Sequence, residues 1–273
     1  MAKRAPRLAA GRARTLGLPT RGTTNPNRLR RVDRWMTGTP AVLRALRAPA
    51  DPLLIDLGYG SSPVTTLEMA RRLGTEVDDL RVLGLEIDQE RVAAAQPMAE
   101  PPTLEFARGG FELAGRRPNV VRAFNVLRQY SESDAAAAWQ TLLDRLAPGG
   151  LLIEGTCDEI GRRCCWVLLT EAGPSTFTLA CRPADIETPA DLAERLPKSL
   201  IHRNVPGERV HALFVDLDAC WANAAPISPF GPRARWVETV RLLVERGWPV
   251  LDNRRRWRLG EVTLDWSCVA PAS

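Results

Sequence analysis

The chain has 273 residues, of which 45% are hydrophobic and 25% are charged. That balance is typical of a globular protein long enough to bury a sizeable core, and it excludes collagen-like and wholly disordered chains. No apolar run approaches the roughly 18 residues that a membrane span needs, so we expect no membrane segment. The length fits one large domain, or one domain with an appendage.

Positive charge is concentrated at the start of the chain. Residues 1–34 carry ten Lys or Arg and one acid, Asp33, so this segment has a charge of +9, whereas the remaining 239 residues sum to −4 within a formal net charge of +5. We expect residues 1–24 to form a flexible, basic leader. The alternative is an arm that contacts a phosphate-rich partner such as RNA.

The six cysteines and two histidines do not form a metal-binding pattern. No two cysteines have the Cys-x-x-Cys spacing, and a structural zinc site needs paired ligands close in sequence. We therefore predict no metal, free thiols in a reducing environment and a cytoplasmic protein. His202 and His211 are candidate general bases by residue type alone.

Residues 25–46 have a helical period, with Leu29, Val32 and Met36 three to four positions apart. The period is interrupted at residues 37–40, so two short helices are expected. Pro49 and Pro52 then indicate a boundary. We interpret residues 25–50 as an N-terminal helical cap.

Strands alternate with helices between residues 53 and 155. Short apolar runs predict strands, and the clearest helix is amphipathic and ends at Pro148. Strands are expected at 53–57, 81–87, 104–107, 119–127 and 151–155, and helices at 63–73, 89–95 and 133–146. The alternation predicts an α/β fold with a Rossmann-like, doubly wound, mostly parallel sheet and helices on both faces.

The pattern changes after Thr156. Residues 163–170 and 176–182 predict an antiparallel hairpin that either extends the main sheet or belongs to a lid. A helix is expected at 189–196, a mixed stretch at 210–217, a strong helix at 233–246 and a strand at 261–269. We place the core at residues 51–182 and a C-terminal α+β extension, which completes the fold as a substrate or lid region, at 183–273.

A glycine-rich turn follows the first strand. Gly58 and Gly60 permit a tight strand-to-helix turn with positive φ, and they let a ligand approach the backbone closely. Ser62 is placed to cap the next helix and Pro63 to begin it. The free N–H groups of that helix start then face the turn.

Two acids indicate which ligand this turn suits. Asp56, just before the turn, repels a pyrophosphate but suits an ammonium group, and Pro63 replaces the third glycine of the dinucleotide motif. Glu86, near the end of the second strand, can accept both hydroxyls of a ribose. Together the two acids favour S-adenosylmethionine over NAD.

The sequence resembles the Rossmann-like, class I S-adenosylmethionine-dependent methyltransferases. Four segments carry the resemblance in family order over residues 53–155, namely LLIDLGYGSSP, VLGLEID, NVVRAFNVLRQY and LAPGGLLIEG. The resemblance implies that Asp56 holds the amino-acid end of the cofactor and that Glu86 holds its ribose. The full cofactor site that it implies is Asp56, Gly58, Tyr59, Gly60, Glu86, Ile87, Gly110, Phe111 and Asn125.

The sequence departs from the family pattern at two places. After the third strand, Gly110 stands where many members have an acid that contacts the adenine amino group, and Phe111 either lies against the adenine face or packs in the core. After the fourth strand, the Asn-Pro-Pro-Tyr of amide and base amino methylation is absent, which favours the small-molecule branch. Asn125 is expected near the cofactor, whereas Arg128 and Tyr130 either face the substrate or are structural.

Two basic and aromatic segments lie outside these motifs. Arg28, Arg31 and Trp35 share one helical face that suits a carboxylate, a phosphate or RNA, so Arg31 and Trp35 are further substrate candidates. Residues 254–258, Arg-Arg-Arg-Trp-Arg, form the second segment. The alternative for both is a solvated face whose tryptophan packs inward.

The sequence thus predicts a methyltransferase that transfers the sulfonium methyl of S-adenosylmethionine, by in-line displacement, to an unidentified small-molecule acceptor. The alternatives are an RNA or protein methyltransferase guided by the basic arm, and a non-catalytic protein of the same fold. Neither the acceptor atom nor the oligomeric state follows from the sequence.

Overall fold

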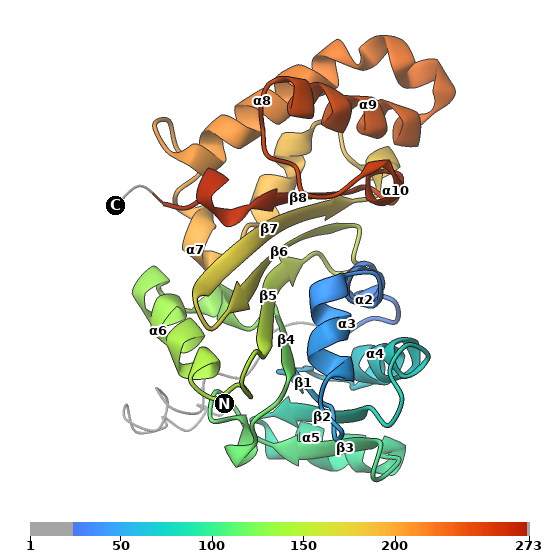
Figure 1. The fold of residues 1–273 in the computed structure, drawn as a ribbon, viewed down its shortest axis with the longest axis vertical. Helices are drawn as coiled ribbons and strands as arrows, with labels where there is room; N and C mark the ends of the chain where they lie inside the picture. Colours follow the sequence, from blue (N-terminus) through green and yellow to red (C-terminus); the bar gives the residue numbers. More distant parts are fainter. Residues whose placement is uncertain (1–23, 272–273) are drawn as a thin grey trace, which may run out of the picture.

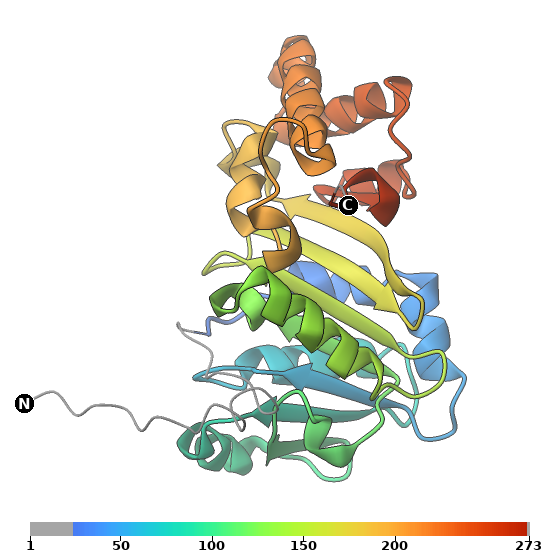
Figure 2. The same cartoon turned by 90° about the vertical axis from the view of Figure 1, so that its left-hand side faces the viewer.

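The computed structural model describes residues 24–271 of the chain (Figures 1 and 2). One eight-stranded sheet runs through them, with the strand order β3-β2-β1-β4-β5-β6-β7-β8. Apart from Thr24, the predicted basic leader lies outside the described residues.

The first five strands of the sheet are parallel, so their carboxyl ends meet at one edge. They are β1 (Leu53–Leu57), β2 (Arg81–Glu86), β3 (Leu104–Arg108), β4 (Val120–Phe124) and β5 (Leu151–Cys157). β1 lies between β2 and β4, so the chain order reverses at β1. Ligands of open α/β sheets bind outside the carboxyl ends at such a reversal. The prediction of a Rossmann-like, mostly parallel sheet is confirmed.

The last three strands are antiparallel and continue the same sheet. They are β6 (Arg163–Thr170), β7 (Gly173–Cys181) and β8 (Glu261–Asp265). The predicted hairpin is therefore present, and it extends the main sheet. Because β8 pairs with β7, the C-terminal segment supplies the edge strand of the sheet.

Helices cover both faces of the sheet (Figure 1). One face packs against α2 (Arg30–Thr37), α3 (Pro40–Arg47), α4 (Val64–Gly74) and α5 (Gln89–Ala95). The other face packs against α6 (Glu132–Leu143), α7 (Lys198–Ile201), α8 (Arg209–Asn223), α9 (Pro232–Glu245) and α10 (Arg254–Trp257). The α6 helix shows why the sequence folds this way: the predicted stripe Ala135, Ala138, Trp139 and Leu142 is buried, and Ser131 caps the helix by accepting the Asp134 N–H.

Short 3₁₀ turns join these elements. They are η1 (Gln96–Met98), η2 (Leu113–Gly115), η3 (Leu127–Gln129), η4 (Pro183–Asp185), η5 (Pro189–Arg195), η6 (Ala225–Phe230) and η7 (Trp266–Cys268). Among residues 24–271, no helix is long and apolar enough to cross a membrane.

Four local predictions were wrong. The stretch 210–217 lies inside α8, and the helix expected at 189–196 is the 3₁₀ segment η5. The fourth strand ends at Phe124, because Asn125 turns the backbone to a φ of 60°. The fourth helix begins at Val64 with Pro63 as its N-cap residue, although Ser62 Oγ still accepts the Val64 N–H at 3.4 Å.

Candidate functional site

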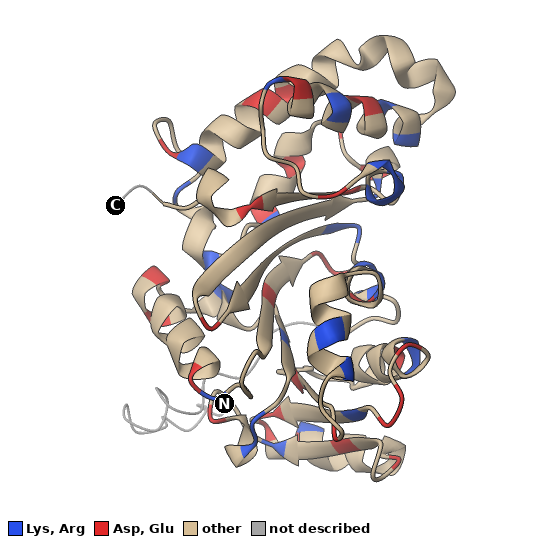
Figure 3. Ribbon diagram, viewed as in Figure 1, with Lys and Arg blue, Asp and Glu red and all other residues tan. Residues whose placement is uncertain are grey.

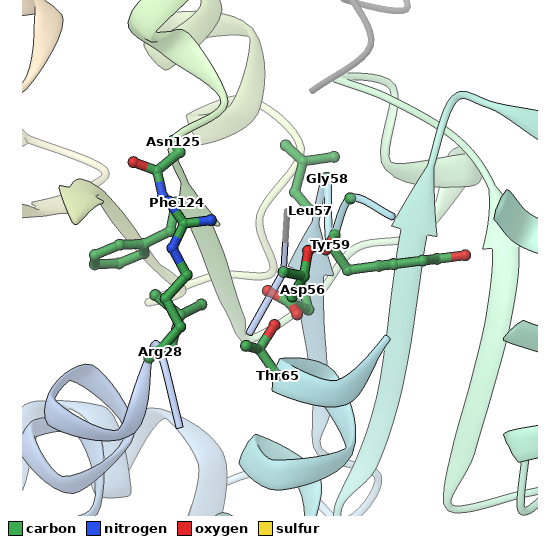
Figure 4. A pocket seen from close by; sticks show the side chains of 11 residues that line it. Arg28, Asp56, Leu57, Gly58, Tyr59, Thr65, Phe124 and Asn125 are labelled. Atoms are coloured by element: carbon green, nitrogen blue, oxygen red, sulfur yellow. Dashed lines mark hydrogen bonds between the residues drawn. The ribbon is translucent and has the colours of Figure 1, made fainter. Parts of the chain in front are cut away.

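A small cavity lies at the carboxyl ends of β1 and β4 (Figure 4). Its volume is about 30 Å³, which is enough for about one or two water molecules. The lining residues are Thr24, Arg28, Leu29, Asp56, Leu57, Gly58, Tyr59, Gly60, Thr65, Phe124 and Asn125. The structure therefore brings the glycine-rich turn, the acid before it and the residue after β4 to one place.

The turn after β1 requires glycine at two positions. Gly58 has a φ of 71° and Gly60 a φ of 83°, in the left-handed region where a side chain is strained. The Gly58 N–H donates to the Leu85 carbonyl at 2.7 Å, which ties the turn to the end of β2. The Tyr59 ring extends toward β2 and packs edge-on against Phe106 (Figure 4).

Asp56 is paired with a buried arginine that the sequence analysis missed. Arg122, in the middle of β4, donates to the two Asp56 oxygens at 2.9 and 2.7 Å and to Asp33 of α2 at 2.5 Å. Thr66 donates to Asp56 Oδ2 at 2.6 Å. Burial opposes the charge on Arg122, but Asp56 and Asp33 outweigh it and hold the pKa of Arg122 above its ordinary value. Asp56 therefore lines the cavity as one half of an ion pair.

Two sequence signals pointed to this pairing. Arg122 is the one charged residue in the otherwise apolar strand VVRAF, and Asp33 is the one acid among residues 1–34. Both side chains are fully buried. A buried charge needs a partner of opposite sign, so the sequence implied that Arg122 and Asp33 each have a partner. It did not show that they pair with each other.

Glu86 lies at the end of β2, directly beside the glycine turn. Its Oε2 accepts the Gly60 N–H at 3.0 Å, and its Oε1 accepts the Ile87 N–H at 2.9 Å. Arg91 of α5 lies 3.5 Å from Oε2. The two acids singled out in the sequence thus flank the same turn, and the Glu86 carboxylate is folded onto it.

An acid also lies beyond β3, two residues after Gly110. The Glu112 Oε1 accepts the Gly110 N–H at 2.7 Å, and its Oε2 is buried with no hydrogen-bond partner within residues 24–271. Phe111 is buried and packs against Tyr130, with 5.6 Å between the ring centroids. A buried oxygen with an unmet hydrogen bond requires an explanation, and a ligand donor supplies one.

Asn125 joins the cavity to a cysteine of β5. Its φ of 60° is rare outside glycine, and such backbone positions cluster at functional sites. Its Nδ2 donates to Cys157 Sγ at 3.2 Å, and its Oδ1 accepts the Cys157 N–H at 3.1 Å. Burial opposes ionisation of this thiol, but hydrogen bonds from Cys164 and Asn125 and the charge of Arg28 lower the pKa of Cys157 to about 7.

Among known proteins, the similarities found for this chain are to solved structures. No protein-family model and no curated protein matches the chain. Similar structures include human N-acetylserotonin methyltransferase with SAM (19% identity, TM-score 0.31, 42% of this chain and 32% of that chain). A second is the cyclopropane synthase MmaA2 from Mycobacterium tuberculosis (19% identity, TM-score 0.33, 42% of this chain and 39% of that chain). A third is Streptomyces venezuelae DesVI (17% identity, TM-score 0.32, 57% of this chain and 73% of that chain).

Several structural neighbours are named as methyltransferases, but the identities and TM-scores are low. The chain spans 32% and 39% of the length of the first two structures named above. The sheet order β3-β2-β1-β4-β5 and the glycine turn after β1 decide the fold. The chain has a Rossmann-like fold, with a parallel core β3-β2-β1-β4-β5 and antiparallel C-terminal strands.

Two of the expected substrate residues follow β4. Arg128 is exposed and lies in η3, and Tyr130 packs beside Phe111. Partial burial and the nearby Arg195 lower the pKa of Arg128. Arg128 and Arg195 therefore lie close together, and Arg195 also lies 3.9 Å from Glu159.

The other two expected substrate residues hold α2 on the sheet. Arg31 donates to the backbone carbonyls of Gly161 and Leu259, at 3.1 and 2.8 Å. Trp35 is buried and packs edge-on against Trp166, with 5.5 Å between the ring centroids.

Neither histidine lines the cavity. His202 follows α7, with its Nε2 at 3.0 Å from Lys198 Nζ, and His211 lies on α8. Within the described part of the chain, no group of three or more His, Cys, Asp or Glu is arranged to hold a metal ion.

Proposed function

We propose that this protein is an S-adenosylmethionine-dependent methyltransferase that acts on a small-molecule acceptor. The observation that carries the proposal is the meeting of Asp56, Glu86 and the Gly58–Gly60 backbone at one turn, at the point where the sheet order reverses. Carboxylates on both sides of this turn disfavour a pyrophosphate and suit a ligand with a cationic group.

The small cavity suits the amino-acid end of the cofactor. Arg28, which donates to the Asp158 and Cys157 carbonyls, and Asp56, which is held by Arg122 and Thr66, line it from two sides (Figure 4), so a fixed cation and a paired anion face a carboxylate and an ammonium group. With a volume of about 30 Å³, the cavity does not hold a nucleoside. The nucleoside therefore lies outside it, along Glu86 and Glu112.

This edge of the sheet offers a candidate residue for each part of the nucleoside, the ribose and the adenine. Glu86 exchanges the Gly60 N–H, at 3.0 Å, for ribose hydroxyls as the turn opens. The unpartnered Oε2 of Glu112 accepts from the adenine amino group, which supplies the acid that Gly110 lacks. Phe111 and Ile87 provide apolar surface beside them.

The bound cofactor supplies an already activated methyl group. The chain then has to align the acceptor and exclude water. Asn125 lines the cavity, and the exposed Arg128 guanidinium suits an acceptor with a carboxylate or a phosphate. Because no histidine lines the cavity, we assign no general base.

Calorimetry with S-adenosylhomocysteine tests cofactor binding. In the variant Glu86→Gln we expect the Kd to rise by at least about tenfold, because a neutral amide accepts ribose hydroxyls less strongly than a carboxylate. Glu90→Gln, an exposed acid on the neighbouring α5, is the matched control and is expected to bind like the parent. The proposal fails if the parent shows no binding at about 1 mM ligand, or if the two variants bind alike.

Methyl-labelled cofactor identifies the class of acceptor. After incubation with a cell extract, we expect label in the small-molecule fraction and none in RNA or protein. Label in RNA that disappears with deletion of residues 1–23, and with rising salt, would support the basic-arm alternative. Tight binding without label in any fraction would support a non-catalytic cofactor-binding protein.

A further inference from the structure

A second and larger cavity lies at the far end of the sheet. Its volume is about 690 Å³, and it is bounded by the start of α9, by η4 and by α10. A pocket of this size falls in the range that encloses small organic ligands. Its floor is apolar and includes Val237 and Pro183. The cavity is distinct from the cofactor site, because Arg182 follows β7, which lies three strands from β4 and so about 14 Å away.

Four arginines line this cavity. They are Arg182, Arg233, Arg254 and Arg258. In the ribbon of Figure 3, α10 is mostly blue, the colour of Lys and Arg, and it lies beside the sheet. The segment Arg-Arg-Arg-Trp-Arg, singled out in the sequence, thus contributes Arg254 and Arg258 to a concave site, whereas the Trp257 ring packs into the core.

Three of these guanidinium groups form no ion pair within the described residues. They are those of Arg233, Arg254 and Arg258, whereas Arg182 lies 3.4 Å from Asp185. The one acid in the lining is Glu238.

Glu238 offsets only part of the positive charge of the cavity, because Arg241 and, at longer range, Arg254 share its carboxylate and together lower its pKa. Its carboxylate is already bound by Arg241 of the same helix, at 2.7 Å. The cavity is therefore strongly positive, and an anion that enters it replaces repulsion among arginines with attraction.

The start of α9 adds to this positive potential. Residues 231–234 line the cavity, and α9 is 14 residues long with no acidic residue in its first turn and no side-chain cap. Its N-terminal N–H groups and dipole favour an anion, and phosphate is the anion that arginine binds best in a bidentate manner. Phe230, at the rim, is 79% exposed and offers a flat apolar surface.

We propose that this cavity binds a small organic diphosphate that carries a planar ring. The phosphates lie between Arg233 and the α10 arginines, and the ring lies on Phe230. The two phosphates of the ligand match the arginines on both sides of the cavity. The concave shape of the cavity favours a compact ligand over an extended nucleic-acid strand. This site goes beyond the proposed methyl transfer and does not depend on it.

Calorimetry at low salt with inorganic pyrophosphate and with uridine diphosphate tests the site. S-adenosylhomocysteine is kept in excess, so that the cofactor site does not contribute. In the double variant Arg254→Ala/Arg258→Ala we expect the Kd for pyrophosphate to rise by at least about tenfold. Arg255→Ala, in the same short helix but outside the cavity lining, is expected to bind within about twofold of the parent.

The variant Phe230→Ala distinguishes the contribution of the ligand's ring to binding from that of its phosphates. We expect this variant to bind uridine diphosphate several-fold more weakly than the parent and to bind pyrophosphate unchanged. Circular dichroism confirms the fold of each variant.

Three results would overturn the proposal. They are no binding of either probe at about 5 mM, equal losses in the Arg255→Ala variant, and binding of a short RNA that depends on Arg254 and Arg258 while pyrophosphate does not bind. The last result would assign the surface to nucleic acid.

Discussion

Two carboxylates buried in the same sheet have opposite surroundings. Asp56 of β1 lies on the face covered by α2 and α4, where Arg122 and Thr66 donate to it. Glu154 of β5 lies on the face covered by α6, and its Oε2 has no hydrogen-bond partner within residues 24–271. Burial raises the pKa of Glu154 to about 8, so this group is mostly protonated at neutral pH.

The comparison shows two ways to bury an acid. On one face a cation compensates the charge, and on the other face the charge is avoided by keeping the proton. The paired acid lies at the carboxyl edge of the parallel strands and joins α2, β1 and β4, because Arg122 binds Asp33 and Asp56 together. Pairing therefore fixes the position of the glycine turn, whereas the unpaired Glu154 contributes no such link.

The largest expected effect comes from removing the shared cation. Arg122→Leu leaves the buried Asp56 with only the Thr66 hydroxyl and the buried Asp33 with only Arg72 at 2.5 Å, so we expect a loss of about 3–5 kcal/mol in the free energy of unfolding. Urea denaturation at pH 7 measures it. The triple variant Asp33→Leu/Asp56→Leu/Arg122→Met removes all three charges and is expected to recover most of that loss. A single variant that loses less than about 1 kcal/mol would show that the pairing is unimportant.

Glu154→Gln tests the opposite face through pH. Because burial raises the pKa from 4.5 to about 8, the folded chain keeps a proton that the unfolded chain releases between these values. The stability of the parent therefore falls as pH rises through that interval, by an amount on the order of 4 kcal/mol, and the glutamine variant is spared this loss.

The free energy of unfolding of the Glu154→Gln variant, relative to the parent, is thus expected to increase from pH 5 to pH 8. Glu105→Gln, on the exposed side of β3, is the matched control and is expected to show no such trend. A pH-independent difference for Glu154→Gln would mean that this carboxyl is ionised in the folded protein.

The variant Asp33→Asn is a smaller change that tests whether the ion pair with Arg122 links α2 to the sheet. The amide still accepts a hydrogen bond from Arg122, and Asp56 still compensates the charge, so we expect a loss of about 1–3 kcal/mol. Hydrogen exchange is expected to accelerate in α2 and to stay unchanged in α6. Equal acceleration in both helices would indicate global destabilisation instead of a local link.

The smallest effect is expected where a similar ion pair is exposed. Arg81 lies 2.6 Å from Asp51, but the Asp51 side chain is 66% exposed. Asp51→Ala is expected to cost less than about 1 kcal/mol, and the cost is expected to shrink further in 0.5 M salt, measured by thermal unfolding. If Asp51→Ala lost as much free energy of unfolding as Arg122→Leu, burial would not explain why the two ion pairs differ in strength.

Local pattern was sufficient for the elements that form the site. The strand at 53–57 and the helix at 89–95 have the predicted bounds, because apolar periodicity is a property of neighbouring residues. The stretch 210–217 was misjudged, since Val210, Phe214 and Val215 are weak helix formers and α8 is stabilised by its packing on the core.

By itself, the sequence determined the alternation of strands and helices, the glycine turn and the two acids beside it. Only the tertiary structure decided which charges meet: Arg122 binds partners 66 and 89 positions away, and the arginines of the second cavity come from three separate segments. The reason is physical. Backbone conformation follows from nearby side chains, whereas the partner of a buried or crowded charge is set by the packing of distant segments.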